Sequence, residues 1–134
     1  MKTLLLATML STLLSNGTQT TPLVKPDTLP EKCPSVSSIL SQGLDHVSPF
    51  LFPGKNYWVG IKENSHYDTN DNWGVYTAGE GDKNGRIAIQ QLSKNIGSMQ
   101  FKEGPGWDSD TGLVYCVYES DSHVTLAFTP SIYS

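Results

Sequence analysis

The sequence predicts an α+β fold, in which an antiparallel sheet of four to five strands has one main helix packed on one face and a short N-terminal helix. Three observations support this class. The length of 134 residues suits a single domain. Strand-like runs lie on both sides of an amphipathic helical pattern. The last two β-prone runs are joined by a short polar turn, which is typical of an antiparallel hairpin. This order of elements is common in sheets with a helix on one face.

The first predicted element is a helix of about two turns that ends before Gly43. Its apolar residues recur at helical spacing. They are Val36, Ile39 and Leu40. Residues 44–55 contain two prolines and a glycine, and we expect them to form a loop whose Phe50, Leu51 and Phe52 fill space in the core.

Two strands are predicted next, over residues 57–61 and 73–78. Successive side chains in a strand point to opposite faces, so Tyr57 and Val59 share one face. The polar residues 64–72 form the connection. We expect the two strands to pair as a hairpin with a long loop.

The main helix is predicted over residues 86–96. Asp82 or Asn84 is expected to cap its first turn, and Gly97 is expected to end it with a positive φ. Its apolar stripe follows the helical period. The stripe consists of Ile89, Leu92 and Ile96.

The C-terminal part of the chain is predicted to be mostly β-structure. A brief extended piece over 99–101 is followed by a glycine-rich loop over 103–112. Residues 113–118 and 123–129 are rich in β-branched and aromatic side chains. Only four residues separate these two runs, so we expect a tight hairpin.

The N-terminal segment has the pattern of a secretory signal. Residues 1–17 combine one positive charge, an apolar run over 3–15 and small residues ending at Gly17. The apolar run is too short to cross a bilayer as an uncut anchor. A buried N-terminal helix is the alternative. Residues 18–32 carry three prolines and are predicted to be a flexible leader, and residues 33–134 form the domain.

Export determines how the two cysteines are interpreted. In an oxidising compartment, Cys33 and Cys116 are predicted to form a disulfide. Closing so long a loop stabilises the folded state by about 4 kcal/mol in the chain-entropy model. The alternative is a pair of free thiols, one of them nucleophilic. The apolar and aromatic neighbours of Cys116 do not favour it, because such surroundings raise a thiol pKa. We therefore expect a secreted or periplasmic protein.

Composition excludes several classes of protein. Hydrophobic residues make up 37% and charged residues 16% of the chain, which is unlike collagen, a coiled coil or a multi-span membrane protein. The formal net charge is −4 and the pI is about 5.2. Nucleic-acid binding needs clustered lysine and arginine, so we expect no nucleic-acid partner. We also expect no integral membrane span after cleavage.

Two Asp- and Asn-rich segments are weak candidates for calcium binding, because oxygen side chains alternate in them. The first contains Asp68, Asn70 and Asn72, and the second contains Asp108 and Asp110. The first lacks the glycine at its sixth position and the glutamate at its twelfth, and the second has glycine one place too early. Ordinary turn chemistry is the preferred interpretation. No metal or other cofactor is predicted.

Two further classes of function stay open. Glu63 and Glu80 end the two central predicted strands and would form the acid/base pair of a small secreted hydrolase if they faced each other. The chain has no Gly-x-Ser-x-Gly nucleophile motif. A protease-inhibitor-like module is the other alternative, and it would present a protruding loop over residues 103–111.

The favoured interpretation is a non-catalytic binding domain that recognises another protein or an envelope ligand. If one helix covers one face of the sheet, the other face is free to make contacts. Aromatic side chains are common in such surfaces. The candidates are Trp58, Tyr67 and Trp107. We expect Trp107 to be exposed because it lies in a Gly-Pro-Gly-Trp segment.

Three short segments support a resemblance to known proteins. Residues 33–39 (CPSVSSI), 67–73 (YDTNDNW) and 115–118 (YCVY) resemble small exported two-cysteine domain families of intracellular γ-proteobacterial pathogens. Those bacterial families are uncharacterised in function. The resemblance covers roughly residues 33–130 and implies an exported α+β domain, and it carries over no catalytic residues.

Overall fold

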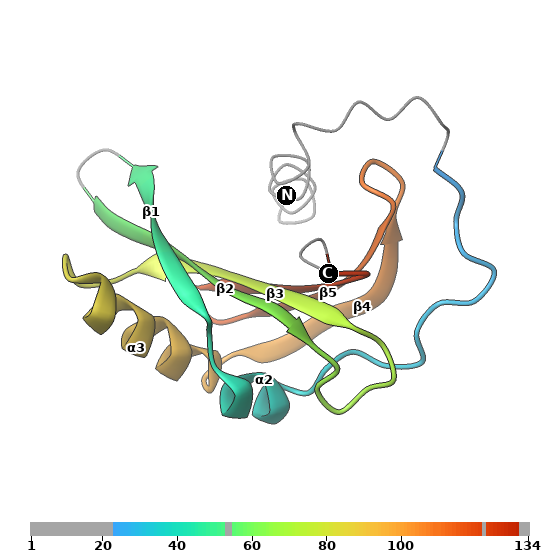
Figure 1. Ribbon diagram of the computed structural model, residues 1–134, viewed down its shortest axis with the longest axis horizontal. Coiled ribbons are helices and arrows are strands. Elements are labelled where there is room, and N and C mark those ends of the chain that lie inside the picture. Colours follow the sequence, from blue (N-terminus) through green and yellow to red (C-terminus); the bar gives the residue numbers. More distant parts are fainter. Residues whose placement is uncertain (1–22, 53–54, 122, 132–134) are drawn as a thin grey trace.

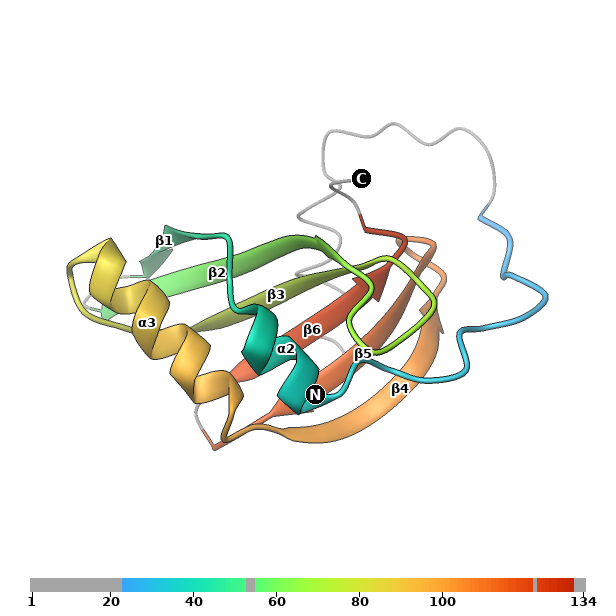
Figure 2. The ribbon, with the colours of Figure 1, turned by 60° about the horizontal axis from the view of Figure 1, so that its bottom comes forward.

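The chain folds into one antiparallel sheet of six strands with two helices in its described part. The structure is a computed structural model and describes residues 23–52, 55–121 and 123–131. The signal peptide predicted over 1–17 lies outside these residues. The strand order is β1-β2-β3-β6-β5-β4 (Figures 1 and 2, with all six strands labelled in Figure 2). The elements are α2 (Val36–Gln42), β1 (His46–Phe52), β2 (Lys55–Ser65), β3 (Trp73–Glu80), α3 (Gly85–Ile96), β4 (Gln100–Asp108), β5 (Leu113–Glu119) and β6 (Val124–Thr129).

Both described helices lie on the same side of the sheet, which we call the near face (Figures 1 and 2). α3 packs against β1, β2 and β3, and α2 packs against α3. Large side chains fill the space between the helices and the sheet. The buried members of this cluster are Ile39, Trp73, Val75, Ile96, Met99, Val114, Cys116, Tyr118 and Ala127. Neither helix is long and apolar enough to cross a membrane.

Local sequence signals explain the two helices. Ser35 caps α2, where its hydroxyl accepts a hydrogen bond from the Ser38 amide at 3.1 Å. Asn84 caps α3, as one of the two predicted alternatives, and accepts from the Arg86 amide at 2.9 Å. The expected positive φ at Gly97 is wrong, because this residue has φ −62°. The chain leaves α3 through further helical turns instead of a left-handed residue.

The sheet has six strands because two segments expected to be loops are edge strands. Residues 46–52 form β1, although Pro49 lies within them. Residues 100–108 form β4, which pairs with β5 through two register shifts, so the expected loop over 103–112 is largely strand. Proline is tolerated at a sheet edge, where its missing amide costs no ladder hydrogen bond. Phe50 is 49% exposed instead of filling the core.

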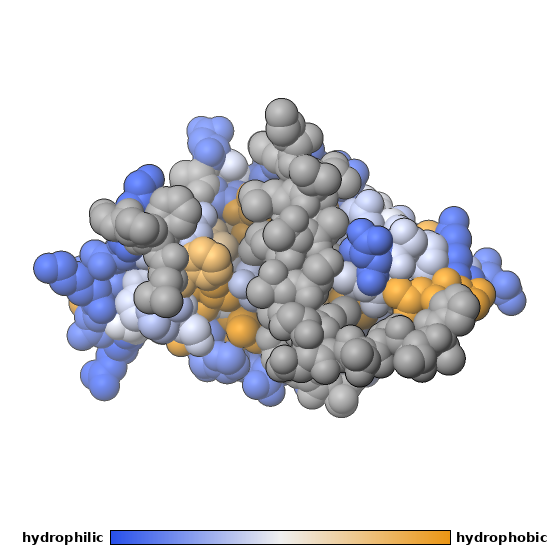
Figure 3. Space-filling view, turned by 90° about the horizontal axis from the view of Figure 1, so that it is seen from above, coloured by the Kyte–Doolittle hydropathy of each residue, from blue (hydrophilic) through white to orange (hydrophobic). Residues whose placement is uncertain are grey.

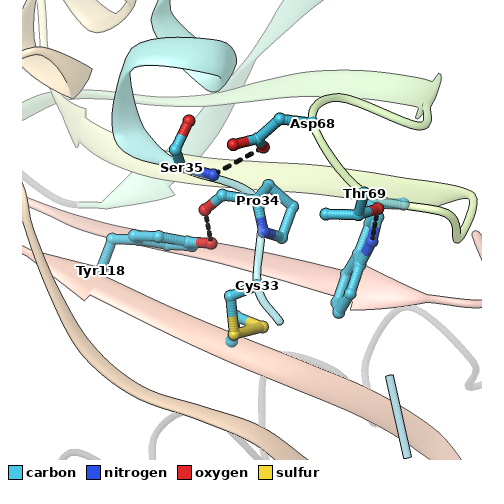
Figure 4. Close-up of a disulfide and its surroundings, with 8 residues drawn as sticks. Cys33, Pro34, Ser35, Asp68, Thr69 and Tyr118 are labelled. Atoms are coloured by element: carbon cyan, nitrogen blue, oxygen red, sulfur yellow. Dashed lines mark hydrogen bonds between the residues drawn. A yellow bond between two sulfur atoms is a disulfide. The ribbon is translucent and has the colours of Figure 1, made fainter. Parts of the chain in front are cut away.

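The predicted disulfide is present. Cys33 and Cys116 are bonded, with their Cα atoms 6.0 Å apart. The bond fastens the segment before α2 to β5, next to two hydrogen bonds that hold the same segment (Figure 4). The Tyr118 hydroxyl donates to the carbonyl of Pro34, and the Ser35 amide donates to the Asp68 carboxylate at 2.9 Å. We call this set of contacts the clasp.

Candidate binding face

The side of the sheet opposite α2 and α3, which we call the far face, carries a continuous apolar surface. Strand pairing aligns residues across four strands: Ile61 lies beside Tyr76, Tyr76 beside Leu126, and Leu126 beside Val117. Every residue in this row points to the far face because side chains alternate along a strand. The buried members of this cluster are Val59, Ile61, Tyr76, Ala78, Leu113, Val117, Leu126 and Phe128.

These eight side chains are 0–8% exposed, although both described helices lie on the near face. The partly buried apolar residues that pack against the cluster are Tyr57, Tyr115 and Val124. All three come from the strands of the sheet itself. Figure 3 views the molecule from this side and shows apolar residues in orange bordered by polar residues in blue.

Glycines allow two aromatic rings to lie flat against the far face. Gly74 pairs with Phe128, and a Cβ at Gly74 would lie 2.8 Å from the ring. Gly106 pairs with Tyr115, and a Cβ at Gly106 would also lie 2.8 Å from that ring. Contacts this short leave no room for a side chain. The two glycines therefore shape this surface.

The outer corner of the far face is aromatic and exposed. Phe50 on β1 pairs with Tyr57 on β2, and their rings meet edge to face with centroids 6.1 Å apart. The other side of the sheet has a counterpart in Phe101, which is 51% exposed and lies 5.8 Å from the ring of Tyr118. Phe50 and Phe101 are thus similar in exposure and ring geometry but lie on opposite faces.

Charged groups border the far face, and glutamates outnumber the lysines among them. Glu63, Glu80 and Glu119 occupy far-face positions on β2, β3 and β5. Each has a cationic or titratable partner. The pairs are His46–Glu63 at 3.4 Å, Lys55–Glu80 at 3.2 Å and Lys102–Glu119 at 3.1 Å.

A fourth glutamate, Glu103, pairs with Val117 and continues this acidic border onto β4. Burial raises the pKa of Tyr115, and the negative charges of Glu103 and Asp108 raise it further. The tyrosine therefore stays neutral and available as a hydrogen-bonding group.

The three aromatic residues predicted to bind a partner lie toward the near face instead. The indole of Trp58 donates to the Asp82 carbonyl at 2.8 Å, beside the start of α3. Tyr67 and Trp107 pack against the near-face cluster. The expectation that Trp107 is exposed is wrong, because the residue is partly buried and its indole nitrogen is inaccessible. A role of these residues in binding stays a prediction.

The Tyr67 hydroxyl is also buried, and neither it nor the Trp107 indole nitrogen has a hydrogen-bond partner among the described residues. Burial raises the pKa of Tyr67, with a smaller contribution from the charge of Asp45. Tyr67 adopts φ 52°, a left-handed conformation that fits the turn between β2 and β3. Tyr67 and Trp107 therefore belong to the packing of the near face, on the side of the sheet that the clasp fastens.

Hydrogen bonds within the fold occupy the acidic segments, and apart from Asp68, which accepts from the Ser35 amide in the clasp, they are made within or close to each turn. One oxygen of Asp108 accepts from the Asp110 amide at 3.0 Å, and the other from the Thr111 hydroxyl at 3.1 Å. Asn72 donates its side-chain amide to Asn64 at 3.0 Å. Within the described parts of the chain, no three His, Cys, Asp or Glu side chains gather as ligands for a metal ion. Asn70 lies in the exposed β2–β3 connection.

The structure separates the two carboxylates of the possible hydrolase. β2 and β3 are antiparallel, so Glu80 lies beside Tyr57 while Glu63 lies at the other end of β2. They cannot act on one bond, which requires carboxylates within about 10 Å. Most of the segment expected to protrude as an inhibitor-like loop, residues 103–111, is not a free loop, because residues 100–108 form β4 and pair with β5.

Sequence reasoning missed Phe50 as a surface residue. The alternation of His46 and Ser48 with Val47 is a short strand signal, but the prolines in this segment favoured a loop. Which face the helices cover could not be read from local pattern, because it depends on pairing between distant strands.

Comparison with known proteins gives no relative: no family model matches the chain, and neither a curated protein nor a solved structure matches it.

Proposed function

We propose that this chain is exported, cleaved near Gly17, and acts in the periplasm or outside the cell as a non-catalytic binding domain. Its ligand is another protein or an envelope component, and the far face is the binding surface. The observation that carries the proposal is an apolar row across four strands on the side opposite both described helices. The row itself is at most 8% exposed, so the surface that a ligand can reach is its border, which includes Phe50 at 49% exposed and the partly buried Tyr57. Exposed apolar patches commonly mark interaction sites.

Export is supported by the Cys33–Cys116 disulfide, because such bonds persist in oxidising compartments and are rare in the cytosol. The resemblance to exported two-cysteine families of bacterial pathogens points the same way. A domain of this size also gains from a covalent bond, since small cores supply little stability on their own.

The border of the far face gives the proposal its chemistry. Aromatic residues are frequent among those that dominate binding energy, and Phe50 at the corner of this face is 49% exposed and free to become buried against a ligand. The surrounding glutamates add hydrogen-bond acceptors and negative potential. The ligand expected for such a surface has an apolar side and a positively charged end.

Two single substitutions on opposite faces test the proposal. The natural exported form is purified as wild type, Phe50→Ser and Phe101→Ser, and each is used to capture ligands from cell-envelope extract and from host-cell lysate. Each variant removes one half-exposed ring that contacts a tyrosine, so we expect the two substitutions to lower the free energy of unfolding by similar amounts. We expect Phe50→Ser to lower recovery of the captured species by about tenfold or more, the scale of a binding hot spot, and Phe101→Ser to retain it.

Equal recovery by the two variants would contradict a role for the far face. A selective loss with Phe101→Ser would move the binding surface to the near side. Circular dichroism of each variant checks that the sheet is retained.

A further inference from the structure

The segment that leads into the clasp contacts the domain at two points and is exposed between them. At its start, Leu23 packs on Gly112, where an added Cβ would lie 3.0 Å from a methyl group of the leucine. Toward its end, Leu29 packs against the near-face cluster, shortly before the disulfide of Cys33. Residues 24–28, which we call the exposed loop, are all exposed. The loop is thus presented between two contacts with the domain.

The backbone of this segment is open to a partner. Residues 23–32 form neither helix nor strand, and no hydrogen bond joins them to the rest of the described chain. Pro26 fixes its own φ and favours an extended conformation at Lys25. In Figures 1 and 2 the segment, in blue, runs along the outside of the molecule beyond β4. Extended chain with open backbone groups is the form in which peptides pair with a strand of a partner.

One apolar side chain stands out from the exposed loop. Val24 is 82% exposed, whereas the other exposed large hydrophobic side chains of the described chain are 41–51% exposed. A valine on extended chain fits the small apolar pocket that sets specificity in elastase-type serine proteases. A polyproline-binding groove is the competing partner, but it reads prolines three apart, and Pro26 and Pro30 are four apart. The chemistry of the loop therefore favours a protease.

The two contacts also distinguish an inhibitor from a substrate. A loop that is held near its bound conformation loses less entropy on binding, which strengthens the complex. Protease–inhibitor complexes form in this way, with little movement of the backbone. Here Leu23 holds the chain before the Val24–Lys25 peptide bond, and Leu29 and the disulfide hold the chain after it.

We propose that the exposed loop inhibits a serine protease with a small apolar specificity pocket, and that Val24 occupies this pocket. Residues 103–111, which the sequence offers as an inhibitor-like loop, are largely strand, and the loop that the structure does present lies in the segment before the clasp. This activity goes beyond the proposed function and uses a surface other than the far face.

Inhibition kinetics with the exported, disulfide-bonded protein test the inference. The probes are an elastase-type protease and trypsin, whose pocket takes lysine and arginine instead of small aliphatic residues. We expect equimolar inhibition of the elastase-type protease and no inhibition of trypsin. Val24→Asp places a charge in the apolar pocket and should raise the inhibition constant by about 30-fold or more, the scale of a binding hot spot. The matched control is Ile87→Asp, which changes a 41% exposed β-branched residue on α3 and should leave the constant unchanged.

Full activity of the elastase-type protease in the presence of excess protein would overturn the inference. Equal inhibition by wild type and Val24→Asp, or inhibition of trypsin alone, would also overturn it. Rapid hydrolysis of the Val24–Lys25 bond adds one water and leaves a carboxyl group on Val24 and an amine on Lys25. If protease activity then recovers completely, the loop is a substrate and the inference is wrong. None of these outcomes affects the Phe50-dependent capture, which reports on the far face.

Discussion

Single glycines determine how closely aromatic rings approach the sheet. A Cβ at Gly74 would lie 2.8 Å from the Phe128 ring, whereas a Cβ at Gly85 would meet Trp58 at an ordinary 3.5 Å. We predict that Gly74→Ala lowers the free energy of unfolding by about 1–3 kcal/mol through overpacking. Gly85→Ala should raise it by about 0.5 kcal/mol, because alanine favours the helix. Urea denaturation measures both, and equal losses in the two variants would refute this account of the far face.

We expect the free energy of unfolding to depend on pH through one histidine, His123. His123 packs over Gly79, and the Asn95 side-chain amide donates to its Nε2 at 3.2 Å. Burial lowers the pKa of His123, and the charge of Glu80 and a backbone hydrogen bond offset this only in part. The folded state therefore binds a proton less readily than the unfolded state.

The sign of the pH effect follows from this lowered pKa. The stability contributed by neutral His123 is complete above the unfolded value of about 6.5 and is lost as the pH falls below it. We expect His123→Gln to be less sensitive to pH between about 7 and 5 than wild type. Thermal melts across this range measure the difference. Parallel pH profiles for the two proteins would show that His123 does not contribute.

At the scale of elements, the clasp joins the segment before α2 to β5. The disulfide closes a loop with a sequence separation of 83, so its removal in Cys33→Ser/Cys116→Ser should cost about 4 kcal/mol of unfolding free energy. Urea denaturation with and without reductant measures this. The double serine variant is its own control, because reductant should not change it. Wild type that is equally stable oxidised and reduced would contradict the prediction.

The Asp68 end of the clasp is predicted to respond to acid. Burial alone would raise the pKa of Asp68, but hydrogen bonds from the Ser35 amide and side chain outweigh it, and the pKa is lowered. Its stabilising effect is therefore present above about pH 4 and lost as the pH falls through the folded value. We expect Asp68→Asn to destabilise at pH 7 by about 0.5–1.5 kcal/mol, the net value of one hydrogen bond. Urea midpoints at pH 7 and pH 3 measure this, and a gap between the proteins that persists in acid would argue against it.

Elements with regular patterns were predictable from sequence, and those with irregular edges were not. The α3 stripe, its Asn84 cap and the β5–β6 hairpin follow local rules. β1 and β4 contain Pro49 and Pro105, which locally indicate a loop, and pairing with β2 and β5 overrides that preference. The disulfide was predictable because an N-terminal pattern typical of exported proteins, together with an even number of cysteines, favours a bridge. The binding face was not predictable from the sequence, because it depends on which face of the sheet the helices cover.

At the scale of the whole molecule, the sheet has two unlike sides. The near face is closed by helices and fastened by the clasp, whereas the far face presents apolar residues with an acidic border. Export with an intact disulfide is the claim on which the proposed function rests.

Intact-mass analysis of the natural protein, with and without alkylation, tests that claim most directly. The account predicts a chain that begins at Thr18, takes up no alkylating reagent until it is reduced, and then takes up reagent at Cys33 and Cys116. A chain that retains Met1 and is alkylated at both cysteines without reduction would contradict it.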